Sequence, residues 1–286
     1  MRELTLNGAQ EHAAASGLAD VRMVRSQAPE RIVVDEDALT GTRLKYFSAS
    51  PDVDYWTRRW AHAGEVSYAR EMRGHLPHQL RDTFRRWVSP GARTLEAGCG
   101  LGHFTVATHV LGYRAEGVDW SGEIIGRLRQ RFAGIPWHVG DVRRLEFPDQ
   151  TFDAVYSPGV CEHFEEGPSA ILSETRRILR PGGVAIISTP CFNAWLQRRI
   201  VEHTSAAEPD APFFQYAFTP EGLGRLVATL GFDVLQVRPY ATLDSFMRYG
   251  GWRVPVALQK PAAVALDYLP VLRQWGSTCI WVARKV

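Results

Sequence analysis

Residues 94–102 read Thr94-Leu95-Glu96-Ala97-Gly98-Cys99-Gly100-Leu101-Gly102. The apolar start continues the strand pattern of Arg93–Ala97, and three glycines at alternate positions follow before a helical pattern begins near Phe104. Glycine allows sharp backbone turns and lets a ligand lie against the main chain, and a helix start offers unpaired N–H groups. We therefore predict a strand, loop and helix that hold an adenosine-containing ligand at the carboxyl edge of a parallel sheet.

The spacing of the glycines separates two classes of ligand. The dinucleotide fingerprint is G-x-G-x-x-G, whereas the third glycine here comes one residue earlier. Glu96 stands two residues before the first glycine, where a carboxylate would repel a pyrophosphate but tolerate an ammonium and a sulfonium group. The pattern disfavours a nicotinamide-dependent oxidoreductase, which stays open as an alternative. The alternative is that the glycine-rich turn only packs the helix on the strand and binds no ligand.

Outward from this loop, short apolar segments alternate with helical patterns. Strands are predicted at Arg93–Ala97, Ala115–Val118, Trp137–Val139, Phe152–Tyr156, Gly183–Ser188, Asp233–Val237 and Cys279–Ala283. Helices are predicted at Phe104–Val110, Ser121–Phe132, Pro168–Leu179 and Thr219–Leu230. Such alternation predicts an α/β fold, in which a parallel sheet carries helices on both faces.

The rest of the chain predicts additions to this core. Residues 1–45 are polar and weakly periodic, which favours a flexible tail. Residues 46–90 carry aromatic residues at helical spacing until Pro90-Gly91, and we expect an N-terminal helical lid there. The α/β core would span 91–286, with cap insertions at about 190–218 and 240–277, because these stretches are long for plain connections.

Acidic residues follow the second and third strands at the same predicted edge. Asp119 comes 21 residues after Gly98, where an acid would accept both ribose hydroxyls; capping of the helix at Ser121 is the alternative. Trp120 would lie on an adenine ring, or else belong to the core. Asp141 would accept from an exocyclic amine while the Val142 N–H donates to a ring nitrogen, or Asp141 would be a turn residue.

Composition excludes several classes of function. The 286 residues hold 33 basic and 31 acidic side chains, a net charge of +2, so no strong field would attract nucleic acid. The four cysteines lie far apart and predict no disulfide scaffold. His75 and His78 lack a third ligand nearby, so we expect no metal. We expect no secretory leader and no integral membrane segment, and we expect a cytoplasmic protein.

Five motifs occur in the order and spacing of a known family: Glu96–Gly102, Gly117–Ser121, Gly140–Val142, Phe152–Val155 and Leu179–Gly183. Together they resemble the motifs of class I S-adenosylmethionine-dependent methyltransferases, most of all the small-molecule branch with the ubiquinone-biosynthesis enzymes. The likeness covers about residues 92–190 and resumes at 217–232. It implies a Rossmann-like, seven-stranded, mostly parallel sheet with its last strand antiparallel, and S-adenosylmethionine as methyl donor.

The resemblance also implies roles for particular residues. By motif match, the cofactor-binding residues are Glu96, Gly98, Cys99, Gly100, Asp119, Trp120, Asp141, Val142 and Ser157. The residues of the glycine loop would line the methionine part, and Ser157 would face the sulfonium side. We interpret Cys99 as a small filler and not as a nucleophile. The loop Ser157–Val160 departs from the Asp/Asn-Pro-Pro-Tyr motif of enzymes that methylate bases or glutamine amides, which disfavours those acceptors.

Methyl transfer needs positioning above all, and a hydroxyl acceptor also benefits from a base. The candidate base is His163, on the loop after the fourth strand, where Glu162 would tune an imidazole whose ordinary pKa is about 6.5. The alternative is that the Glu-His pair only organises the cofactor loop. His163 is thus the single predicted catalytic residue.

Aromatic residues crowd two segments outside the core, 46–60 and 192–218. They favour a small aromatic or lipophilic acceptor methylated at a hydroxyl oxygen, unless these rings only join the cap to the core. Methylation at nitrogen or carbon, and a module that binds the cofactor without turnover, are the alternatives. Residues 246–275 fit a cap helix pair, a dimer surface or a segment that touches a lipid-linked substrate, so a homodimer stays open.

Overall fold

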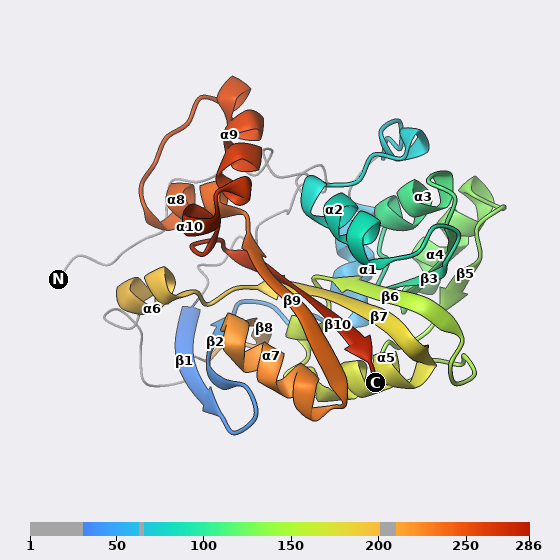
Figure 1. Ribbon diagram of the computed structural model, residues 1–286, viewed down its shortest axis with the longest axis horizontal. Helices are drawn as coiled ribbons and strands as arrows, with labels where there is room; N and C mark the ends of the chain where they lie inside the picture. The colour runs from blue at the N-terminus through green and yellow to red at the C-terminus, as the bar shows by residue number, and fades with distance from the viewer. Residues whose placement is uncertain (1–30, 63–65, 201–209) are drawn as a thin grey trace.

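Seven strands form the main sheet of the protein. We describe residues 31–62, 66–200 and 210–286 of a computed structural model (Figure 1). The strands of the main sheet are β3 (Arg93–Ala97), β4 (Arg114–Asp119), β5 (Trp137–Val139), β6 (Phe152–Pro158), β7 (Leu179–Pro190), β9 (Phe232–Tyr240) and β10 (Thr278–Lys285). Their order is β5-β4-β3-β6-β7-β10-β9. Each strand predicted from the sequence is present.

The directions of the strands match the expected sheet. β4 and β6 flank β3 in parallel, and β5 and β7 continue the parallel set outward. β10 runs antiparallel to both β7 and β9, so β9 keeps the direction of the parallel strands. The seven-stranded, mostly parallel sheet with its last strand antiparallel is therefore confirmed.

Helices cover both faces of this sheet, and local sequence explains where they begin. The helices between the strands are α3 (His103–Val110), α4 (Gly122–Arg131), α5 (Ser169–Ile178) and α7 (Pro220–Thr229). Thr219 caps α7 by accepting from the Gly222 N–H, and Pro220 takes the first helical position, where a missing N–H costs nothing. Ile186 and Ile187 of β7 pack into different apolar clusters, as expected when both faces are covered.

A second, three-stranded sheet corrects part of the prediction for the N-terminus. It consists of β1 (Arg31–Asp37), β2 (Gly41–Phe47) and β8 (Phe213–Phe218), antiparallel in the order β1-β2-β8. Residues 31–45, predicted as the end of a flexible tail, thus form a hairpin, while residues 1–30 of that tail lie outside the described residues. The hairpin is stable because Leu44 is fully buried and Asp37 accepts from the Thr40 N–H in the turn.

The predicted helical lid is divided into shorter pieces. Residues 46 and 47 belong to β2, and the helices that follow are α1 (Val53–Ala61), the 3-10 turn η1 (Glu71–Arg73) and α2 (His78–Trp87). In the cap regions the structure contains α6 (Ala194–Ile200), α8 (Thr242–Tyr249), α9 (Val256–Tyr268) and α10 (Pro270–Arg273). Figure 1 shows α8, α9 and α10 grouped together at one end of the molecule. Among the described residues, no helix is long and apolar enough to cross a membrane.

Candidate active site

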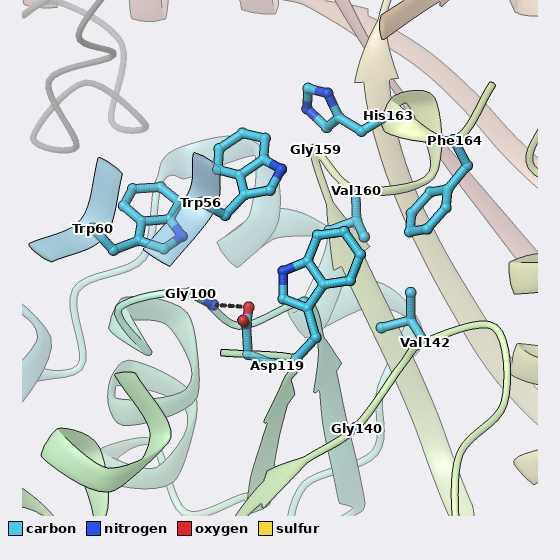
Figure 2. A pocket seen from close by; sticks show the side chains of 12 residues that line it. Trp56, Trp60, Gly100, Asp119, Gly140, Val142, Gly159, Val160, His163 and Phe164 are labelled. Carbon is cyan, nitrogen blue, oxygen red and sulfur yellow. Dashed lines mark hydrogen bonds between the residues drawn. The ribbon is translucent and has the colours of Figure 1, made fainter. Parts of the chain in front are cut away.

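A pocket opens where the parallel strands end. It is lined by Trp56, Trp60, Gly98, Gly100, Asp119, Trp120, Gly140, Val142, Gly159, Val160, His163 and Phe164. The loops after β3, β4, β5 and β6 form one wall, and α1 supplies two tryptophans on the other. Figure 2 shows Trp60 near Gly100 and Asp119, His163 close to Trp56, and Phe164 on the side of the pocket opposite Trp60. The carboxyl edge of the sheet is where ligands of such folds bind.

The glycine loop leaves its wall of the pocket without side chains. Gly98 and Gly100 have φ values of +80° and +47°, which favour glycine. A Cβ at Gly98 would lie 2.5 Å from Cγ2 of Val160, and one at Gly100 would lie 3.2 Å from the Trp60 ring. The main chain of the loop can therefore meet a ligand directly.

Asp119 ends β4 with its carboxylate in the pocket. One oxygen accepts from the Gly100 N–H at 2.9 Å, and the other accepts from the Ser121 N–H at 3.0 Å. Burial raises the pKa of this carboxyl, and the backbone hydrogen bonds oppose that shift. The bond to Ser121 matches the alternative role at the start of α4. The same carboxylate also faces the pocket, so the two roles do not exclude each other.

Trp120 and Val142 continue the pocket wall beyond Asp119. Trp120 is half-buried, and its ring centroid lies 5.9 Å from that of Phe164. Val142 is buried beside the loop that starts at Gly140. These apolar groups form a slot beside the carboxylate, which suits a flat ring.

Glu96, by contrast, points away from the pocket. Its carboxyl accepts from the backbone N–H of Thr105 at 2.7 Å and also from the Thr105 hydroxyl. Thr105 lies in the first turn of α3, so the acid ties the helix to β3. Burial raises the pKa of Glu96 to about 8, although these hydrogen bonds favour the ionised form. At neutral pH the group is largely protonated, and it supplies little negative charge to a ligand.

Three further predicted residues are not among those that line the pocket. The Ser157 hydroxyl donates to the Ala97 carbonyl and joins β6 to β3. Cys99 is buried in the apolar cluster around α4, and burial raises the pKa of its thiol far above the usual value, which agrees with the interpretation as a filler. Asp141 is bound by Arg143, whose Nη2 lies 2.7 Å from one carboxylate oxygen. Those Arg143 contacts outweigh burial and lower the pKa of Asp141.

The helix α1 covers the pocket although none of its residues is buried. Trp56 and Trp60 stack at a centroid distance of 5.6 Å, and the Thr57 hydroxyl donates to that of Ser121 at 2.8 Å. The predicted lid segment therefore does lie over the pocket. The aromatic pair at i, i+4 was the sequence signal for this helix face.

His163 lies on the 3-10 turn η2 (Cys161–His163) between two aromatic rings. Its Nδ1 lies 2.9 Å from the Phe214 carbonyl, and its ring packs edge-on against Trp56 and Phe214. The carbonyl makes Nδ1 the protonated nitrogen, so Nε2 is the acceptor. Burial lowers the pKa of His163 to about 4, and the ring is neutral at pH 7.

Its neighbour Glu162 is an unusual group that sequence reasoning treated only as a partner of His163. The side chain is 2% exposed, and its Oε2 has no hydrogen-bond partner. Burial raises its pKa to about 8. Its Oε1 lies 3.7 Å from where a Cβ of Gly159 would be, so only a glycine separates this carboxyl from the pocket.

The structure thus brings Gly98, Gly100, Asp119, Trp120, Val142 and His163 together. The lining residues that were not predicted individually are Gly140, Gly159, Val160 and Phe164. All four belong to the loops after β5 and β6, where the sequence offered motif positions but no chemistry that distinguishes them. The described residues contain no group of three His, Cys, Asp or Glu side chains able to hold a metal ion.

Comparison with known proteins agrees with this geometry. Residues 95–187 match a family model described as a methyltransferase domain. A protein of Mycolicibacterium smegmatis, named as an S-adenosylmethionine-dependent methyltransferase, is 28% identical over 243 residues and 83% of each chain. The malonyl-[acyl-carrier protein] O-methyltransferase of Serratia marcescens is 35% identical over 42% of this chain and 49% of its own.

Two more proteins show how far the similarity extends. The ubiquinone/menaquinone biosynthesis C-methyltransferase of Desulfotalea psychrophila is 35% identical over 37% of this chain and 48% of its own, which confirms the resemblance to that branch. The fold matches the 1,6-didemethyltoxoflavin-N1-methyltransferase of Burkholderia thailandensis, solved with S-adenosylhomocysteine, at a TM-score of 0.53. That alignment has 17% identity and covers 90% of this chain and 99% of the other.

Proposed function

Because the chain is a class I S-adenosylmethionine-dependent methyltransferase, we propose that it methylates a hydroxyl oxygen of a small aromatic or lipophilic molecule. The observation that carries this proposal is the pocket itself. A buried carboxylate and bare glycines form one side, and aromatic rings form the other. When bound, the cofactor supplies a methyl group on a positively charged sulfur.

The residues of the core wall fit such a ligand. Gly98 and Gly100 would hold its methionine part, because both line the pocket and, lacking side chains of their own, present their main chain to it. Asp119 would accept from the ribose hydroxyls, since its oxygens are already held in place by backbone N–H groups. Trp120 and Val142 would enclose the adenine. Asp141 belongs to this proposal only if its carboxylate leaves Arg143.

The acceptor would bind between α1 and η2. Trp56 and Phe214 pack against His163, and Trp60 stacks on Trp56, so flat apolar surface favours a planar or lipophilic molecule and excludes water around the reacting atoms. The relatives act at oxygen, nitrogen and carbon, as their names state, so they leave the methylated atom open. The aromatic wall and the neutral imidazole support oxygen.

His163 would act mainly as a positioning group and only weakly as a base. With a pKa of about 4, the imidazole is a poor proton acceptor at neutral pH. Its Nε2 can still accept a hydrogen bond from an acceptor hydroxyl and so orient the oxygen lone pair. This role lies between the two interpretations of the Glu-His pair that the sequence allowed.

Isotope labelling tests the function directly. Cell extract is incubated with the protein and trideuteromethyl-labelled S-adenosylmethionine, and mass spectrometry searches for a product heavier by CD₃ in place of H. The control is Gly100→Val, in which the added side chain meets Trp60 and fills the cofactor space. A labelled small molecule that disappears with the control supports the proposal. Cofactor binding without any labelled product would instead favour a binding module.

The predicted location is part of the same proposal. Cys99, Cys161, Cys191 and Cys279 are unpaired and buried, as suits a reducing compartment such as the cytoplasm. Fractionation of cells with an antibody against the protein would check it.

A further inference from the structure

The helix α9 is inverted in its polarity. Gln259, Ala263 and Asp267 form its buried face, and two of these three residues are polar. One exposed stripe has the spacing i, i+3, i+7, i+10 and no charged residue: Leu258, Pro261, Ala265 and Tyr268, with the exposed Lys260 beside it. A helix on a protein surface ordinarily directs polar residues outward, so this helix face indicates a partner other than water.

The buried polar residues are satisfied, which fixes the orientation of α9. Asp267 accepts from Nε2 of Gln79 at 2.9 Å and from the Thr242 N–H at 3.0 Å. Gln259 donates to the Val254 carbonyl at 3.0 Å. Turning the apolar face inward would break these hydrogen bonds and bury no better-matched group.

The apolar surface extends beyond the helix at both ends. Trp252 and Val256 at its start are 53% and 67% exposed, and Leu269 and Val271 after its end are 50% and 67% exposed. With Leu258 and Tyr268, they make six of the fourteen exposed large apolar side chains among the described residues. We call the exposed surface of residues 252–271 the cap patch. Exposed apolar side chains that are scattered singly over a surface are normal, whereas these are clustered in one short segment.

Positive charge accompanies this patch. Arg253 and Lys260 are exposed and Arg273 is half-exposed, while the single acid in residues 250–277, Asp267, is buried and hydrogen-bonded. An apolar face with an exposed tryptophan and basic residues at its border is the composition of helices that lie in a membrane interface. We propose that the cap patch docks on a membrane surface rich in anionic lipids, with α9 parallel to the bilayer.

A second copy of the chain fits this surface less well. A two-fold dimer would place the patch against itself and bring Arg253 and Lys260 near their own copies. No exposed acid lies in residues 250–277 to balance these charges. Anionic lipid headgroups supply that balance, because they attract basic residues near the surface.

The position of the cap patch relative to the pocket indicates what membrane docking would achieve. The cap helices follow β9, which ends at the same carboxyl edge of the sheet as β3, β4 and β6. Figure 1 shows α9 projecting from the end of the molecule where β9 gives way to the cap. Docking there would bring the pocket edge toward the source of a lipophilic acceptor. The docking proposal does not depend on that acceptor or on turnover.

Vesicle binding tests the proposal without any methylation assay. Purified full-length protein is sedimented with vesicles of phosphatidylcholine alone or with phosphatidylglycerol. We expect binding only to the anionic vesicles, and a loss of binding at about 1 M salt, where charges are screened over about 3 Å. The variant Leu269→Glu/Val271→Glu should bind roughly ten-fold more weakly or worse, because it places two acids in the patch.

A matched control separates the patch from exposure in general. Leu39 is 52% exposed in the hairpin turn outside the patch, so Leu39→Glu should bind like the wild type. If the double variant does not fold, as judged by circular dichroism, Lys260→Glu replaces it and should weaken binding to anionic vesicles. Equal binding of wild type and folded variants, or no binding to anionic vesicles, overturns the proposal. So does a wild-type dimer, seen by light scattering, that the patch variants dissociate.

Discussion

The two walls of the pocket are built in opposite ways. The core wall stands at the ends of buried strands, where the N–H groups of Gly98 and Cys99 both donate to the Val118 carbonyl. The lid wall is α1, a helix with no buried residue, which contacts the rest of the protein through the rings of Tyr55, Trp56 and Trp60 and through the Thr57 hydroxyl. The difference shows that the wall proposed to bind the cofactor is held in place by the buried strands of the main sheet. The acceptor side is a weakly held element that can open locally.

The largest expected effect follows from closing the core wall. In Gly98→Val the added side chain would overlap Val160, and we expect binding of S-adenosylhomocysteine to be lost in calorimetry. Gly91→Val is the matched control, because Gly91 has a similar φ of +72° but open space around its Cβ position. Retained binding in folded Gly98→Val would contradict the placement of the cofactor.

Asp119→Ala should weaken cofactor binding by roughly 10- to 150-fold. The range corresponds to a lost hydrogen bond to a charged group, about 1.5–3 kcal/mol. Calorimetry checks the dissociation constant. Asp141→Ala is the companion variant, and its effect should be smaller because Arg143 already occupies that carboxylate. Equal losses in both variants would show that Asp141 also reaches the ligand.

His163→Ala should lower turnover about five-fold, the worth of one neutral hydrogen bond of about 1 kcal/mol, and leave cofactor affinity unchanged. The pH profile gives the sharper measurement. With a pKa of about 4, His163 keeps the same neutral form from pH 5.5 to 8.5, so kcat of the wild type should show no step near 6.5. A step near 6.5 that vanishes in His163→Ala would show that the imidazole is the base with its ordinary pKa.

Removing one lid ring should have a smaller effect, and mostly on the acceptor. Trp56→Ala takes away the ring that packs on His163, and we expect the acceptor KM to rise a few-fold while the cofactor dissociation constant changes less. Trp87→Ala, an aromatic change far from the pocket, serves as control. If Trp56→Ala weakens cofactor binding as much as acceptor binding, the lid wall does not bind the acceptor alone, and the assignment of one ligand to each wall is wrong.

The last expected effect concerns stability and pH, and leaves the ligands of both walls unchanged. Glu162 has an ordinary pKa of 4.5 when unfolded and about 8 when buried, so between these values the folded state holds a proton that the unfolded state lacks. Stability therefore falls as pH rises, by up to about 1.4 kcal/mol per pH unit. Urea unfolding from pH 5.5 to 7.5 should show a shallower fall for Glu162→Gln. The exposed Glu123→Gln should behave like the wild type, and an unchanged slope in Glu162→Gln would contradict the prediction.

The sequence predicted those elements whose pattern lies within a short stretch of neighbouring residues. Each strand of the main sheet is followed closely by its own helix or turn, so period and glycine spacing located β3 to β7 within a few residues. The small sheet escaped prediction because β2 pairs with β8, about 170 residues later, and because the polar β1–β2 hairpin was assigned to a flexible tail. Pairings that distant leave no mark in a short window.

At the site, too, the sequence predicted positions along the chain but not the contacts of single side chains. Gly98, Gly100 and Asp119, which were predicted from their positions in motifs, all line the pocket. It could not show which way a carboxyl at a strand end turns. The Glu96 carboxyl accepts a hydrogen bond from Thr105, and the Asp141 carboxylate accepts one from Arg143. Tertiary packing brings each of these partners to its acid.

The place of β10 in the main sheet has a consequence for how the protein is made. β10 lies between β7 and β9, so β9 has no sheet neighbour until the last of these three strands has been synthesised. While the ribosome is still translating residues 241–277, β9 must wait with an unpaired edge, and such edges are where chains aggregate. Maturation of this half of the molecule is thus a late event. Slow translation or chaperone binding at that stage would decide how much native enzyme a cell obtains.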